Sequence, residues 1–563
     1  MQLVPVLADL ASQSGPTDRE ACERDLEEAS KIGASLVETI LDRGGVDETI
    51  FLQKLAATLG MEFMAESEVE LDEPLHNRFP AKLALRHRLL PGRLGGGDVT
   101  LLTFDPFDLP ARQAVGVELS QDVSWAISSR HQILESLRIG YGVGAENFEE
   151  LVEDREDLGD DDELSQEVNV LDEEDEEATV MSFVNQVFRE ALDQRATDIH
   201  FEPLESDLRI RYRIDGALQE VTVPPNVRLL RSALISRLKI MADLDIAERR
   251  LPQDGRINLE LEGNPIDVRV ATIPSVNGES VSLRLLRRES YDFDKLGLDP
   301  KLADTIRELL DLPNGIILVT GPTGSGKSTT LYTFLRILNT KDTRIVTIED
   351  PVENKLDGVV QIAVKPDIDL TFASGLRSIL RGDPNIIMVG EMRDLETTEI
   401  AVRGALTGHL VFSTLHTNDA VGGISRLVDM GVEPFLITSS VRAFLAQRLV
   451  RTLCPHCSKP AELSPEYLDS IGFPHEGREG IRQPVGCREC RQSGYLGRMA
   501  IMEICVLSRK VGDLVTRGAN AGEIRPQAIA DGMVPMRQYG WKKASEGITT
   551  VEEVLTATAA DEV

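Results

Sequence analysis

Residues 321–329 read Gly-Pro-Thr-Gly-Ser-Gly-Lys-Ser-Thr and match the pattern Gly-x-x-x-x-Gly-Lys-Ser. An apolar run typical of a strand precedes them at 316–319, and a helix-compatible stretch follows at 331–338. Glycines let successive backbone N–H groups point into one concavity, to which the helix N-terminus adds partial positive charge. The sequence therefore predicts a site for a nucleotide polyphosphate rather than a turn that binds nothing. Its predicted members are Gly321, Pro322, Thr323, Gly324, Ser325, Gly326, Lys327, Ser328 and Thr329, with Lys327 on the β- and γ-phosphates and Ser328 on Mg²⁺.

Strand–helix alternation surrounds this loop. The apolar runs at 344–348, 386–389 and 410–414 are typical of buried parallel strands. Asp350 and Glu353 follow the first run, Glu391 follows the second, and His409 and His416 bracket the third. Taken singly, such a carboxylate is as often a helix cap and such a histidine a core residue. Their number and order favour a site at the carboxyl ends of the strands, with the acids directed toward the metal and both histidines beside it.

The charge of the chain is unevenly spread. Its formal net charge is −34, and residues 146–178 alone hold 18 Asp or Glu against one basic residue, Arg155. Like-charge repulsion predicts a disordered linker there, acting as a solvated spacer rather than as a cation- or partner-binding tail. The remaining chain is also acidic, which disfavours a nucleic acid as a partner.

Several features favour a cytoplasmic protein. Six cysteines, four of them in two tight pairs, are too few and too clustered for a secreted disulfide scaffold. No apolar run is long enough to span a bilayer, and Asp9 interrupts the start of the chain where a secretory signal would be apolar. We expect membrane association only through a partner.

The paired cysteines read Cys-Pro-His-Cys at 454–457 and Cys-Arg-Glu-Cys at 487–490, with 29 residues between the pairs. Two such knuckles suit a tetrahedral Zn²⁺ whose four thiolates leave no open position, so the predicted role is structural. A redox role is the alternative. The predicted ligands are Cys454, Cys457, Cys487 and Cys490, and the isolated Cys22 and Cys505 are expected to be inert packing residues.

Four motifs carry a resemblance to a known family. In chain order they are GPTGSGKSTT (321–330), TIEDPVE (347–353), GEMRD (390–394) and TGHLVFSTLHTNDA (407–420). They resemble the Walker A motif, Asp box, Walker B motif and His box of the ATPases that power type II secretion and type IV pilus assembly. The resemblance covers about 179–560, since it includes TDIHFEP (197–203), RYRIDG (211–216), PQDGR (252–256) and the cysteine pairs.

This resemblance implies an α/β fold: a RecA-like P-loop ATPase core preceded by an α+β domain, with a small zinc-binding subdomain and a helical N-terminal domain. The expected domains are a docking domain at 1–145 with a helical hairpin at 30–60, the acidic linker at 146–178, the α+β domain at 179–290, the core at 291–450, the zinc subdomain at 451–500 and a C-terminal helical subdomain at 501–563. Within the docking domain, we expect a strand at 99–104 preceded by a glycine turn at 95–97.

The resemblance also implies roles for single residues. Glu353 takes the position of the catalytic glutamate, Asp350 belongs to the nucleotide-binding Asp box, and Glu391 serves Mg²⁺ and its waters. His409 and His416 belong to the His box. Arg211, and with a less close match Arg228, correspond to arginines donated across a hexamer interface; surface ion pairing is the alternative for both.

The implied function is a homo-hexameric, Mg²⁺-dependent ATPase that hydrolyses ATP to ADP and phosphate. It would act on a platform protein at the cytoplasmic face of the inner membrane, in type II secretion or type IV pilus assembly. The alternatives are a nucleic-acid translocase on the same core and a non-hydrolysing scaffold. Residues 34–60 resemble a cyclic-di-GMP-binding module of some relatives but lack its initial Arg-Leu-Gly, so we expect platform docking there.

Overall fold

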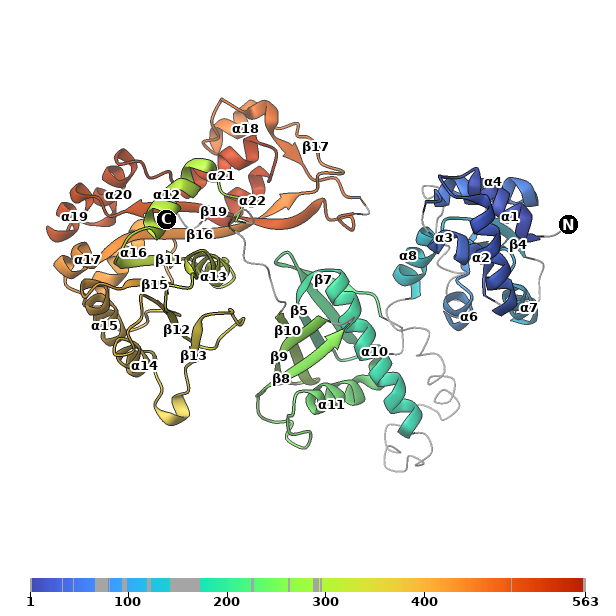
Figure 1. Ribbon diagram of the computed structural model, residues 1–563, viewed down its shortest axis with the longest axis horizontal. Coiled ribbons are helices and arrows are strands. Elements are labelled where there is room, and N and C mark those ends of the chain that lie inside the picture. Colours follow the sequence, from blue (N-terminus) through green and yellow to red (C-terminus); the bar gives the residue numbers. More distant parts are fainter. Residues whose placement is uncertain are drawn as a thin grey trace. The chain divides into compact units, whose positions relative to one another are not determined.

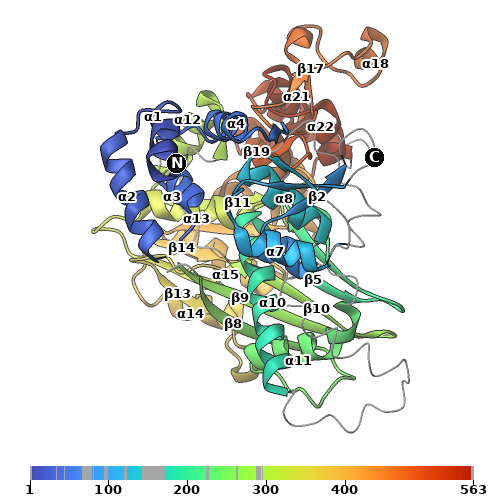
Figure 2. The same ribbon diagram turned by 90° about the vertical axis from the view of Figure 1, so that its right-hand side faces the viewer.

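The computed structural model describes residues 3–65 (except 33 and 44), 79, 81–93, 99–118, 123–141, 173–223, 227–261, 264–286, 293, 296–487 and 489–559. The chain forms two compact units, Met1–Leu285 and Leu286–Val563. Figures 1 and 2 show the chain in two views, coloured along the sequence from the N-terminus to the C-terminus. Among the described residues, no helix combines the length and the apolar character needed to cross a bilayer.

The first unit begins with helices packed on a four-stranded sheet. The predicted hairpin at 30–60 is present as α3 and α4, whose N-caps Ser35 and Asp47 accept bonds from the amides of Glu38 and Ile50. The predicted strand at 99–104 is β3, whereas the glycine turn at 95–97 lies outside the described residues. The sheet order is β1-β4-β3-β2. The elements are α1 (Leu3–Ser12), α2 (Arg19–Ile32), α3 (Leu36–Asp42), α4 (Glu48–Leu59), β1 (Glu62–Phe63), α6 (Ala81–Arg86), β2 (Leu90–Arg93), β3 (Val99–Thr103), α7 (Leu109–Glu118), β4 (Ser124–Ile127) and α8 (Arg130–Tyr141).

Helix α10 (Glu173–Asp193) corrects the predicted end of the linker. Residues 173–178 were expected to be disordered, but they form the first turns of this helix. Burial of Phe183 and Val187 holds the helix in place, and acidic residues are favourable near a helix N-terminus, so the acidic turn extends from the packed part. Residues 146–172 of the predicted linker lie outside the described residues.

The α+β part of the first unit is a six-stranded sheet with the order β7-β6-β5-β10-β9-β8. Burial alternates along β5 and β6, and Phe201 and Ile210 join one core with Phe183 of α10 and Leu234 of α11. Figure 1 shows α10 and α11 beside this sheet. The opposite sheet face therefore carries the polar residues of these strands. The elements are β5 (Ala196–Pro203), β6 (Leu208–Ile214), β7 (Ala217–Val221), η2 (Val227–Leu230), α11 (Arg231–Met241), β8 (Gln253–Leu261), β9 (Asn264–Ser275) and β10 (Gly278–Leu286).

The second unit is built on a seven-stranded sheet with the order β13-β12-β14-β15-β11-β16-β19. All neighbours pair in parallel except β16 and β19, which are antiparallel. The predicted buried strands are β12, β14 and β15, and separate hydrophobic cores on the two sheet faces make a helix–sheet–helix sandwich. The strands are β11 (Gly315–Thr320), β12 (Ile345–Glu349), β13 (Val360–Ala363), β14 (Ile386–Val389), β15 (Leu410–Leu415), β16 (Val441–Leu453) and β19 (Tyr495–Val506).

Helices cover both faces of this sheet. Those of the central part of the unit are α12 (Pro300–Leu310), α13 (Lys327–Leu338), α14 (Phe372–Ile379), α15 (Leu395–Leu406), α16 (Ala420–Asp429) and α17 (Pro434–Ser440). Those of the C-terminal part are α18 (Pro465–Ser470), α19 (Arg509–Thr516), α20 (Ala521–Ala530), α21 (Met536–Ser545) and α22 (Val551–Thr558). The short antiparallel pair β17 (Lys459–Pro460) and β18 (Arg482–Gln483) flanks α18 in the sequence.

Two predicted domain boundaries fall inside strands of this sheet. The boundary at 450 divides β16, and the boundary at 500 divides β19. These long strands pair with each other and bury Leu445, Val450, Ile501 and Ile504, so the core sheet includes residues assigned to the zinc and C-terminal parts.

One buried ion pair ties the α+β part together. The Lys239 Nζ of α11 lies 2.6 Å from a carboxylate oxygen of Glu279, and the two side chains are 1% and 6% exposed. Lys239 also donates to the Glu248 carbonyl at 2.7 Å. Both charges are shielded from water, so each charge is stabilised mainly by its partner.

We predict that Lys239→Met destabilises this part by about 3–5 kcal/mol, because it leaves the Glu279 carboxylate buried without a cation. Lys239→Met combined with Glu279→Gln should recover much of the loss. The measurement is amide hydrogen exchange of residues 196–285 in the full chain. Arg256→Met, which breaks an exposed pair with Asp267 in the same part, is the control. An equal effect from Lys239→Met and Arg256→Met would contradict the prediction.

Candidate functional site

The glycine loop leaves the sheet between β11 and α13. All six residues of β11 are buried, and α13 begins at Lys327. Gly321 and Gly326 have φ values of 150° and 87°, and a Cβ on either would come within 2.7 Å of Gln447 atoms. Glycine is required at both positions by the backbone conformation and by the close approach of β16.

Gln447 of β16 supports the glycine loop and the start of α13 through two hydrogen bonds. Its Nε2 donates to the Ser325 carbonyl at 2.8 Å, and its Oε1 accepts from the Thr330 hydroxyl at 2.7 Å. Its exposure is 1%, so these bonds are made without competition from water. Sequence reasoning missed this residue; the available signal was a glutamine inside a predominantly apolar strand.

Glu391 and Glu353, two of the predicted carboxylates, affect the pKa of Lys327. Its Nζ donates to the carbonyls of Gly321 and Pro322 at 2.8 and 2.9 Å. Burial lowers the pKa of Lys327, while the charges of Glu391 and Glu353 oppose that shift. The structure therefore brings the lysine of the loop and both acids to the same sheet edge.

Glu391 is the centre of a charged cluster after β14. His416 Nε2 lies 3.5 Å from one Glu391 oxygen, and Arg393 forms an ion pair with the other. Arg393 also lies 3.9 Å from a carboxylate oxygen of Asp350. Arg393 thus links Asp350 to Glu391, and His416 lies beside Glu391. Arg393 was not singled out in the sequence analysis, although it lies within the GEMRD motif.

A buried carboxylate, Glu349, lies behind the Glu353 loop. It is 4% exposed and accepts bonds from Thr347 Oγ1 at 2.5 Å, Gln361 Nε2 at 3.1 Å and the Tyr332 hydroxyl. Burial raises the pKa of Glu349 although the three hydrogen bonds oppose the shift. Sequence reasoning missed these residues because only the fold brings them together.

His409 is not part of this cluster. It precedes β15, and its carbonyl accepts from the amide of Gly315 at 3.1 Å, at the end of β11 opposite the glycine loop. The six-residue length of β15 separates His409 from the loop edge by about 20 Å. The expectation that both histidines lie beside the phosphate site is therefore wrong for His409. The two residues that flank a strand lie at its opposite ends.

The predicted arginines belong to the first unit. Arg211 and Arg209 of β6 both donate to the Glu202 carboxylate of β5. Burial alone would raise the pKa of Glu202, but these two hydrogen bonds outweigh it and hold the pKa below its usual value. Arg228 lies exposed on η2.

The same sheet face has a cavity of about 550 Å³ that the sequence analysis missed. His200 lies in it with Nδ1 3.1 Å from the Ser282 hydroxyl, and burial lowers the pKa of His200. Arg284 Nε donates to Asp198 at 2.9 Å. The sequence signal that could have indicated this cavity was the alternation of charged with apolar residues along the strands of the six-stranded sheet. The basic residues that line the cavity are His200, Arg256, Arg269 and Arg284.

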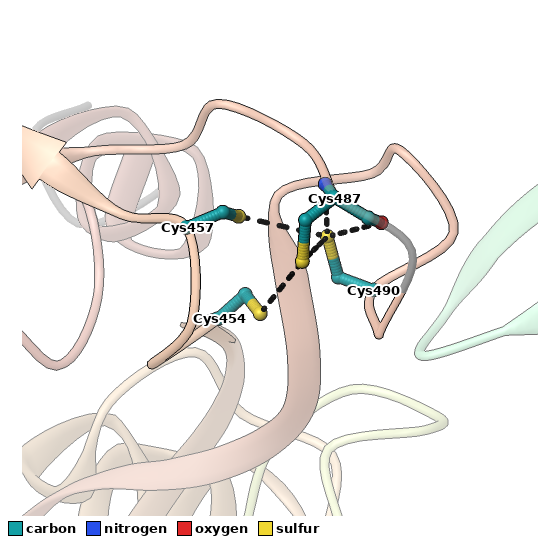
Figure 3. Close-up of side chains that lie close together, drawn as sticks. All are labelled: Cys454, Cys457, Cys487 and Cys490. Atoms are coloured by element: carbon teal, nitrogen blue, oxygen red, sulfur yellow. Dashed lines mark hydrogen bonds between the residues drawn. The ribbon is translucent and has the colours of Figure 1, made fainter. Parts of the chain in front are cut away.

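The four predicted metal ligands converge (Figure 3). Their Sγ atoms lie within 4.8 Å of one another, and three pairs are 3.7 Å apart. A tetrahedral site with Zn–S distances of about 2.3 Å has S–S edges of about 3.8 Å, so the thiolates fit Zn²⁺. Cys454 directly follows β16, and Cys487 and Cys490 precede β19. Cys22 and Cys505 are buried elsewhere.

Comparison with known proteins places these features in a family. A model of the type II/IV secretion system protein family matches residues 173–556, and a model of the MshEN domain matches 59–144. The MshEN match begins at residue 59, which is close to the end of segment 34–60. That segment is the one whose sequence resembles a cyclic-di-GMP-binding module.

Relatives match over most of their length. The type IV pilus assembly ATPase PilB of Myxococcus xanthus is 42% identical over 553 residues, which is 96% of each chain. The type II secretion system protein E of Xanthomonas campestris is 46% identical over 467 residues, covering 82% of this chain and 81% of that one. The Legionella pneumophila ATPase DotB, at 23% identity and a TM-score of 0.50, covers 67% of this chain and 95% of its own. Its likeness supports the predicted RecA-like core.

The family match covers more than half of the chain, and the Myxococcus xanthus relative, 42% identical, matches 96% of it. The chain belongs to the type II/IV secretion system protein family.

Proposed function

We propose that the protein is a Mg²⁺-dependent ATPase that hydrolyses ATP to ADP and phosphate as a hexamer, powering type II secretion or type IV pilus assembly. The observation that carries the proposal is the convergence of Lys327, Glu353 and Glu391 at the carboxyl edge of the sheet, below the glycine loop. The names of the two bacterial relatives described above support the same class of machine.

The residues divide the chemistry among them. The loop amides and Lys327 would bind the β- and γ-phosphate oxygens, and the Ser328 hydroxyl, Glu391 and Asp350 would hold Mg²⁺ and its waters. Bound Mg²⁺ would neutralise charge that develops on the phosphate oxygens. Glu353 orients the attacking water, and His416 restrains Glu391 from the end of β15.

The partner proposed for this ATPase is a platform protein of the inner membrane. The chain would remain at its cytoplasmic face, with residues 1–145 as the docking domain. A nucleic-acid translocase is disfavoured because the net charge is −34 and a nucleic-acid channel requires positive charge and aromatic stacking surfaces. ATPase turnover measured with and without single-stranded DNA, and with the cytoplasmic part of a platform protein, separates these alternatives.

We predict that Glu353→Gln and Glu391→Gln each keep nucleotide binding but lose hydrolysis by a factor on the order of 10² or more. Each leaves Lys327 and the loop amides intact while removing a negative charge that orients water or metal. Steady-state turnover and nucleotide affinity are the measurements. Glu399→Gln is the control, since Glu399 pairs on the surface with Arg403. Turnover near that of the unmodified protein in both variants would refute the assignment.

A second prediction concerns zinc. Protein purified without chelator should contain about one Zn²⁺ per chain, held by the four thiolates, because this closed donor set suits structural zinc. Cys454→Ser with Cys457→Ser should abolish the metal and unfold about 454–494 while ATP binding at the loop persists. Cys22→Ser, in another core, should leave the metal content unchanged. Absence of zinc, or a disulfide between the pairs, would overturn the prediction.

The third prediction places Arg211 in the active site of a neighbouring subunit. Arg211→Ala and Glu353→Gln should each be nearly inactive, and a mixture should regain partial turnover, because an intact arginine then faces an intact glutamate in some interfaces. Arg284→Ala, mixed in the same way, tests whether the cavity arginines contribute instead. If mixed hexamers form but stay inactive, Arg211 acts within its own subunit or only supports the sheet with Glu202.

A further inference from the structure

We propose that Tyr332 is a positioning residue that fixes the Glu353 loop relative to the phosphate loop through the buried carboxylate of Glu349. The inference rests on the proposed catalytic role of Glu353. It concerns a residue outside the four motif cores, on the helix that begins with Lys327.

Tyr332 connects the two halves of the site with one hydroxyl group. Its side chain is 1% exposed, and the hydroxyl donates to Glu349 Oε2 while accepting the backbone amide of Glu353 at 3.3 Å. Lys327 lies in the same helix, little more than one turn earlier. A rigid helix therefore transmits the position of the phosphate loop to the backbone of Glu353.

Glu349 gives this connection a fixed anchor. It is the last residue of β12, and Thr347 and Gln361 donate to its Oε1. Gln361 also holds the loop itself, since its amide donates to the Asn354 carbonyl at 3.0 Å and accepts from the Leu356 amide at 2.7 Å. The segment 350–356 is therefore held at both ends by the same buried network.

The Glu353 side chain depends on this network for its position. Its carboxylate is exposed, and no hydrogen bond or ion pair to it is found within the described part of the chain. The backbone bond to Tyr332 is therefore the closest constraint on where the carboxylate points. A misplacement of about 1 Å at a catalytic group can reduce a rate by on the order of 10².

The test is a double-mutant cycle between Tyr332→Phe and Glu353→Gln in the full-length protein. Tyr332→Phe keeps the ring in the core, so we expect unchanged nucleotide affinity and KM but a turnover lower by about tenfold. In the Glu353→Gln background the same change should have no further effect, since Tyr332 acts through Glu353. A merely structural role would lower turnover equally in both backgrounds.

Two further variants keep the test decisive. Tyr539→Phe is the matched control, because Tyr539 is a buried tyrosine of the same unit whose hydroxyl accepts the backbone amide of Asp299 at 3.0 Å. It should retain full turnover. Gln361→Met attacks the loop from the other side and should reproduce the loss of turnover without adding to Glu353→Gln, even if Tyr332→Phe folds poorly.

The outcomes separate this inference from the proposed function. Full turnover in Tyr332→Phe, or equal losses in the two backgrounds, would overturn the positioning role while leaving Glu353 catalytic. Full turnover in Glu353→Gln would refute the proposed function and this inference with it.

Discussion

The burial of β11 between two parallel neighbours is the constraint on which the second unit depends. Its residues are buried throughout and pair with β15 on one side and β16 on the other. The register places Thr320 opposite Leu415 and Ala446. The next residues along the three strands, Gly321, His416 and Gln447, must therefore emerge side by side. The proximity of the glycine loop to its supporting residues follows from this register, because a shift would turn apolar side chains into the wrong layer.

Strand β16 extends this constraint to the rest of the unit. Gln447 contacts the glycine loop, and the neighbouring Arg448 donates to the Asn418 carbonyl at 2.8 Å, in the segment between His416 and α16. The strand then continues to Leu453, and Cys454 follows. Antiparallel pairing with β19 restrains this length, and β19 returns directly from the other cysteine pair. A structural metal bound by the four thiolates would thus stabilise the end of β16 and the start of β19.

Sequence reasoning succeeded where chemistry is carried by contiguous motifs and failed where it depends on spatial packing. The glycine loop, the buried strands and the cysteine pairs each have a local signature, so their predicted elements are present in the fold. Gln447 and Tyr332 act through contacts with residues far along the chain, and neither has a motif of its own. The prediction for His409 was wrong because His409 and His416 belong to one sequence motif and were therefore expected to lie close together in space. Strand β15 lies between the two histidines and separates them.

The local charge balance of the site differs from that of the whole chain. The net charge of −34 would repel a polyphosphate, yet screening confines such effects to about 10 Å at ordinary ionic strength. Within the site, the carboxylates of Asp350, Glu353 and Glu391 lie among the cations Lys327, Arg393 and Arg448. Under the proposed ATPase function, a bound nucleotide would add several negative charges to this set of residues, and a divalent cation that enters with it would restore the balance. The same acids would then hinder free ATP and favour its magnesium complex.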